Sequence, residues 1–135
     1  KNDQKIYVSA KEAKTSFIDT RDVSEVIATL LTSDKFNNQA FVLTGTESLT
    51  HTDVAKILSK ITNKKIDYIN ISSEDLANAL KQAGMKDDFV SFFVLIQNYL
   101  AEGYNSATTN NVELILGRKP RTFLEFARDH KSNWL

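Results

Sequence analysis

The sequence predicts a helix-rich α/β fold with about three strands and five to six helices. Short apolar runs alternate with longer segments in which apolar residues recur every three or four positions. These spacings are typical of strands and of helices with one buried face. One proline and four glycines in 135 residues indicate that short connections join the elements. About three strands are too few for a complete doubly wound sheet. They either complete a sheet supplied by other sequence or form a small sheet under helices.

The first half of the chain carries most of the expected strands. They span residues 15–18, 39–43 and 65–71, and residues 6–8 are a further short candidate. Between the first two strands lies a helix whose start Asp22, or Asp19 upstream, is expected to cap. The buried face of that helix follows the helical repeat through Val23, Val26, Ile27, Leu30 and Leu31.

Local start and stop patterns mark the later helices. A threonine or serine followed three residues later by an acidic residue is the pattern of a capping box. It occurs at Thr50–Asp53, Ser72–Asp75 and Thr122–Glu125. Asp87 is expected to cap a longer helix with a broad aromatic face, for which we expect packing in the core or at an interface. Helix ends are expected at Asn63, Gly84 and Gly117.

Composition excludes several kinds of protein. Lysine plus arginine equals aspartate plus glutamate, 17 each, so the zero net charge argues against a nucleic-acid partner. The absence of cysteine excludes a disulfide framework and a thiolate metal site, and two histidines argue against a histidine-rich one. No apolar run approaches the ~20 residues that span a bilayer. We expect no membrane partner and a cytoplasmic location.

Three segments resemble the NmrA-like branch of the NAD(P)-binding short-chain dehydrogenase superfamily. They are the joint FIDTRDV at 17–23, the segment 41–50 beginning FVLTG, and the closing segment GRKPRTFLEF at 117–126. They occur in the family's order and at similar spacing. The chain is similar to the NAD(P)H-quinone oxidoreductases, epimerase-like proteins and nucleotide-sensing regulators of that branch.

The resemblance implies that residues 1–135 form a single lobe on the substrate side, the C-terminal lobe of a longer Rossmann-type protein. In the family the N-terminal half binds NADP or NAD. Among the four glycines no pair stands at G-x-G spacing, so the dinucleotide fingerprint is absent. We therefore expect no cofactor and no catalysis for this chain alone. The expected partners are the missing N-terminal Rossmann half, a small-molecule substrate and, by self-association, a second copy.

Candidate substrate contacts lie at strand ends and on the aromatic helix. They are Tyr7, Phe17, Asp19, Arg21, Phe93 and Tyr104. The simpler interpretation of Asp19 and Arg21 is a structural ion pair at a helix start. Tyr7 and Lys11 match the Y-x-x-x-K spacing of catalytic short-chain dehydrogenases, but strand geometry at residues 6–8 would separate them. We therefore assign no catalytic residue and no metal ligand.

Three functions remain open from the sequence. The parent protein is an NAD(P)H-dependent oxidoreductase acting on a quinone or another small acceptor, a non-catalytic regulator that senses NAD(P), or a free-standing protein-interaction module. Turnover, nucleotide binding without turnover, and a natural start at this chain's first residue would distinguish them.

Overall fold

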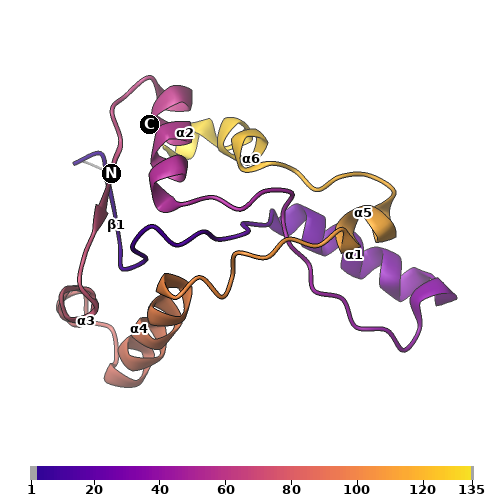
Figure 1. Ribbon diagram of the computed structural model, residues 1–135, viewed down its shortest axis with the longest axis horizontal. Coiled ribbons are helices and arrows are strands. Elements are labelled where there is room, and N and C mark those ends of the chain that lie inside the picture. Colours follow the sequence, from indigo (N-terminus) through magenta and orange to yellow (C-terminus); the bar gives the residue numbers. More distant parts are fainter. Residues whose placement is uncertain (1–2, 135) are drawn as a thin grey trace.

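The computed structural model describes residues 3–134 (Figure 1). Along these residues the regular elements comprise two strands, six α-helices and two short 3₁₀ turns. In chain order they are β1 (Lys5–Val8), α1 (Thr20–Thr32), η1 (Asp34–Phe36), α2 (His51–Thr62), β2 (Asp67–Asn70), α3 (Ser73–Gln82), α4 (Asp87–Ala101), α5 (Asn111–Leu116), α6 (Phe123–Asp129) and η2 (Lys131–Asn133). The predicted helix-rich α/β class is confirmed.

The sheet consists of β1 and β2 in parallel, with Lys5 opposite Asp67 and Val8 opposite Asn70. Both strands therefore end at the same edge, next to Ser9 and Ile71. Parallel strands need a long crossover connection. Here that connection spans residues 9–66 and contains α1 and α2.

Two of the expected strands are wrong. In the described chain, residues 15–18 form only one isolated bridge, between Thr15 and Leu49, and residues 39–43 join no strand ladder. Their apolar side chains are nevertheless used, because Phe17, Ile18 and Phe41 pack against core clusters. The apolar pattern therefore predicted that these side chains contact the core, where they are partly buried, but it did not predict that their backbone joins no strand ladder.

The apolar residues form two clusters. One centres on α1 and α5, with Val26 and Val112 nearly inaccessible to solvent. The other joins α2 to α6 through Val54, Leu58 and Ala127. The segments between these helices bridge the clusters, with Ile18 packing on the first and its neighbour Phe17 on the second.

Most of the predicted helix boundaries are confirmed. Capping boxes begin α2 at Thr50 and α6 at Thr122, and Ser72 caps α3 by accepting a hydrogen bond from the Asp75 amide. Asn63 and Gly117 adopt the left-handed conformation at helix ends. The prediction that Asp87 caps α4 is wrong. Lys86 occupies that position without a side-chain hydrogen bond, and Asp87 is the first residue of α4.

Helix α4 is not a core element of this chain, so of the two expectations, packing in the core or at an interface, only the interface stays a prediction. It packs against α3, with Val90 and Gln97 buried, while Phe89, Phe92 and Tyr99 are exposed. In Figure 1 the α3–α4 pair lies on the opposite side of the molecule from α2 and α6. The aromatic face of α4 is therefore a surface of this chain.

Candidate functional site

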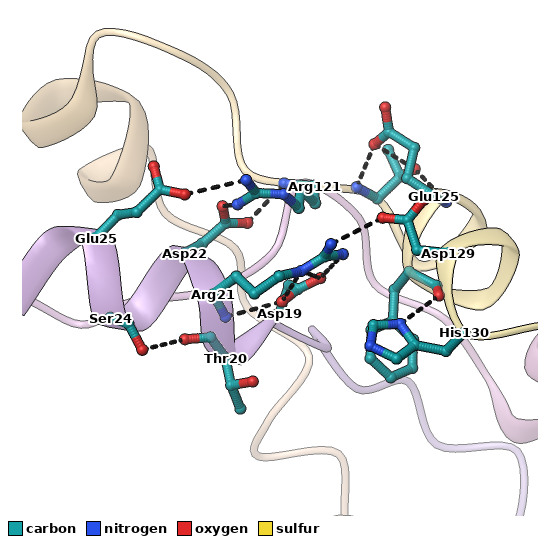
Figure 2. Close-up of polar contacts among 12 residues, drawn as sticks. Asp19, Thr20, Arg21, Asp22, Ser24, Glu25, Arg121, Glu125, Asp129 and His130 are labelled. Atoms are coloured by element: carbon teal, nitrogen blue, oxygen red, sulfur yellow. Dashed lines mark hydrogen bonds and ion pairs between the residues drawn. The ribbon is translucent and has the colours of Figure 1, made fainter. Parts of the chain in front are cut away.

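Two of the predicted residues, Asp19 and Arg21, form an ion pair at the start of α1 (Figure 2). Asp19 is buried and is the N-cap, accepting a hydrogen bond of 2.8 Å from the Arg21 amide. The Arg21 guanidinium binds both carboxylate oxygens of Asp19 and also contacts Asp129 at 2.9 Å. Hydrogen bonding from Arg21 lowers the pKa of the Asp19 carboxyl below its usual range. The hydrogen bonds of both side chains are thus made to other groups of the protein.

Of the two residues expected to cap α1, Asp19 is the cap and Asp22 is not. Its side chain is fully buried, and one oxygen accepts the Arg121 amide at 2.7 Å. The other oxygen binds the guanidinium groups of Arg118, at 2.8 Å, and Arg121. Glu25, one helical turn further along α1, binds the same two arginines and is more exposed. Figure 2 shows Asp22 and Glu25 side by side on α1, facing Arg121.

The three segments that carry the family resemblance therefore meet in one place. Asp22 of the first segment holds Arg118 and Arg121 of the third. Gly45 of the second lies so close to the first that a Cβ atom there would stand 2.0 Å from the carbonyl oxygen of Phe17. A side chain at position 45 would overlap with main-chain atoms, so only glycine fits. These contacts assign the ion pairs a structural role.

A small cavity of about 170 Å³ lies beside this joint. Phe17 and Asp19 line it together with Arg121, Phe123 and Phe126. Sites for cofactors and drug-sized ligands usually enclose roughly 300–1,000 Å³. This cavity is too small for a dinucleotide.

A larger cavity, of about 380 Å³, lies beyond the carboxyl ends of β1 and β2. Open α/β sheets bind their ligands at this edge. Ser9 follows β1 directly, and Ser73 opens α3 just after β2. The far wall comes from the end of α4 and the loop after it, where the Tyr99 and Tyr104 rings stack with centroids 4.4 Å apart. We call this cavity the strand-end pocket.

Polar groups line the strand-end pocket opposite the tyrosines. The Ser73 hydroxyl donates to Asn98 Oδ1 at 2.5 Å and lies 3.4 Å from the hydroxyl of Ser9. At the rim Lys11 pairs with Glu102 at 3.4 Å, and both side chains are largely exposed. The pocket thus combines two aromatic faces with hydroxyl and amide groups, an arrangement suited to a planar ligand with polar substituents.

The structure divides the predicted site residues among different places. Tyr104 lines the strand-end pocket, and Phe17 and Asp19 line the small cavity. Tyr7 projects elsewhere and donates a 2.7 Å hydrogen bond to Asp3, and Phe93 stacks on Phe89. Sequence reasoning missed Ser9, Ser73 and Asn98, although their positions after parallel strands and near a helix end could have indicated the first two.

The side chains of Tyr7 and Lys11 bind different partners. The Tyr7 hydroxyl is bound to Asp3, which raises the pKa of the phenol. A positive φ of 49° at Lys11 turns the chain after β1, and the Lys11 ammonium contacts Glu102. A nearby ammonium would lower a phenol pKa instead.

His51, the first residue of α2, is buried and packs against two aromatic side chains. Its ring contacts Phe17 and Tyr68, with centroids 5.8 and 5.5 Å away. Burial lowers the pKa of His51, and the same cause raises the pKa of Tyr68. The Tyr68 hydroxyl lies 3.0 Å from both the Lys11 carbonyl oxygen and Asn70 Oδ1. Tyr68 thus fixes the turn that follows β1.

None of the four glycines opens a helix in the way that a dinucleotide phosphate turn requires. Gly84, Gly103 and Gly117 follow α3, α4 and α5 with positive φ, and Gly45 packs against Phe17. Residues 3–134 contain no group of three or more side chains placed to hold a metal ion. Within the same range no helix is long and apolar enough to cross a bilayer.

The model of the NmrA-like family matches residues 3–127. The chain belongs to the NmrA-like family. An agroclavine dehydrogenase of Claviceps fusiformis is 32% identical over 130 residues, which are 96% of this chain and 45% of that protein. The predicted resemblance is confirmed at the level of the family.

Solved structures show the same NmrA-like fold. An NADPH-dependent quinone oxidoreductase from Escherichia coli superimposes with a TM-score of 0.87 at 21% identity, over 98% of this chain and 48% of that one. A triphenylmethane reductase from Citrobacter sp., in complex with NADP(H), gives 0.85 at 22% identity, over 95% and 45%. The chain spans about half the length of the relatives that it matches.

Proposed function

We propose that this chain is the substrate-side lobe, residues 1–135, of a longer NmrA-like oxidoreductase that uses NADP or NAD. Its acceptor is a small planar molecule of the quinone type, bound in the strand-end pocket. The observation that carries the proposal is the location of that pocket, at the carboxyl ends of parallel strands and against two stacked tyrosines. We also propose that the protein is located in the cytoplasm.

In this proposal the cofactor supplies the hydride, and it is held by the half that this chain does not include. The chain's own groups bind and orient the acceptor. Tyr99 and Tyr104 offer ring faces to a planar substrate, and Ser73 and Asn98 offer a hydroxyl and an amide to its polar substituents. The joint at Asp22 holds the closing segment against α1 and keeps the lobe rigid.

Turnover by the full-length gene product tests this function. NADPH consumption is followed with benzoquinones, azo dyes and triphenylmethane dyes as acceptors. We expect Tyr104→Ala to raise KM for the acceptor roughly tenfold and to change kcat less, because a stacking face is lost. Tyr7→Ala is the matched control, since this exposed tyrosine lies outside the pocket.

Two results would contradict the proposal. If Tyr104→Ala and Tyr7→Ala behaved alike, the strand-end pocket would not hold the acceptor. If the protein bound NADPH tightly but consumed none with any acceptor, a regulator that senses the nucleotide would be the better interpretation.

A further inference from the structure

The outer face of α4 carries four large apolar side chains in one line. Phe89, Phe92, Ile96 and Tyr99 are 46%, 59%, 38% and 55% exposed. Their spacing of three, four and three residues places them within one stripe along the helix. The opposite side of α4, with Val90 and Gln97, is buried against α3. We call these four residues the α4 seam.

The α4 seam has the spacing of the a and d positions through which two helices pack in a coiled coil. It is also symmetric about residue 94, because Phe89 and Tyr99, like Phe92 and Ile96, lie at equal distances on either side. An antiparallel copy of the same helix would therefore place Phe89 against Tyr99 and Phe92 against Ile96, each contact occurring twice. Such self-complementarity is what a twofold interface requires.

Charges beside the seam favour the antiparallel arrangement. Lys86 and Glu102 cap the two ends of the helix and are also symmetric about residue 94, so each lysine would lie at the same level along the pair as a glutamate of the other copy. A parallel pair would instead place Asp88 beside Asp88. Antiparallel helices also align their macrodipoles favourably. In the described structure Glu102 makes only an exposed 3.4 Å contact with Lys11 and remains accessible.

The area available indicates a weak dimer. An aromatic side chain buries roughly 150–250 Å² when covered completely. With about half of each seam residue exposed, and with Leu95 at the margin, each copy would bury on the order of 500 Å². A standard stable interface buries about 800 Å² per partner. The dimer is therefore expected to be weaker than one with a standard interface.

We propose that the α4 seam is a self-association surface through which two copies of this chain pair antiparallel, Phe89 against Tyr99 and Phe92 against Ile96. Tyr99 also lines the strand-end pocket, so the second copy would reach the edge of that pocket. The proposal does not depend on the oxidoreductase function, because it concerns mass and contact geometry in the absence of cofactor and acceptor.

Sedimentation velocity over a dilution series of the 135-residue chain tests the association. The average mass is expected to rise from 15.2 kDa toward twice that value as concentration increases. Phe92→Glu should weaken the dimer at least tenfold, because it buries two unpaired carboxylates. Leu31→Glu is the control: this leucine of α1 is even more exposed than Phe92, 81% against 59%, and lies outside the seam, so its substitution should leave the dimer intact.

Cysteine cross-linking tests the orientation of the two helices. Because the chain has no native cysteine, a disulfide can form only between the introduced cysteines. An oxidised mixture of Phe89→Cys and Tyr99→Cys should give a covalent mixed dimer. Either variant alone should give little, because identical positions would lie about 15 Å apart along the antiparallel helices. A monomer at every concentration, an unchanged dimer in Phe92→Glu, or efficient cross-linking of Phe89→Cys with itself would overturn the proposal.

Discussion

Replacing Asp22 with alanine should destabilise the protein by about 3 kcal/mol. Breaking a buried ion pair from one side typically costs about 3–5 kcal/mol, because the other charge loses its partner. Here Arg118 and Arg121 have side chains 36% and 29% exposed, so water and Glu25 recover part of the loss. The Arg121 amide also loses its acceptor, which adds a further cost. The lower end of the range is therefore expected.

The magnitude separates this role from that of a simple cap. Loss of an N-cap alone would cost about 1 kcal/mol. Urea denaturation followed by the fluorescence of Trp134 measures the difference, with the slope of the transition checked for constancy. Glu25→Gln is the matched control, since Glu25 binds the same two arginines from an exposed position, and its loss should be much smaller. A loss below about 1 kcal/mol for Asp22→Ala would refute the buried-joint account.

Two further substitutions test the same region. Gly45→Ala should cost more than about 3 kcal/mol in unfolding free energy, because its Cβ would stand 2.0 Å from the backbone oxygen of Phe17; a near-normal midpoint in urea would contradict that packing. Burial lowers the pKa of His51 below its ordinary 6.5, so the unfolded state binds the proton more readily. Its contribution to stability should be complete above pH 6.5 and decline as the pH falls below that value. His51→Gln should flatten this part of the stability–pH curve; a curve unchanged from that of the native chain would contradict the assignment.

The sequence predicted those features that depend on neighbours in the chain. The capping boxes at Thr50 and Thr122 follow from contacts three residues apart, and the end of α2 at Asn63 follows from a single backbone conformation. The family was also identified correctly. These signals are local, so no knowledge of the tertiary fold was needed.

Features that depend on distant contacts were missed or misassigned. Residues 39–43 have a strand-like apolar pattern, but in the described chain no partner strand lies beside them. Asp22 resembles a cap by position, and only the approach of Arg118 and Arg121, nearly a hundred residues later, shows its role. The strand-end pocket likewise joins β1, α3 and α4. Strand pairing and burial at these sites are tertiary properties.

Calorimetric titration of this chain with NADPH tests the central claim most directly. If the chain is the substrate-side lobe and the phosphate-binding turn belongs to the other half, the dissociation constant should lie above roughly 1 mM, near −4 kcal/mol. The four glycines, each used at a helix end or against Phe17, provide no such turn. Micromolar binding of NADPH to the 135-residue chain would contradict the claim.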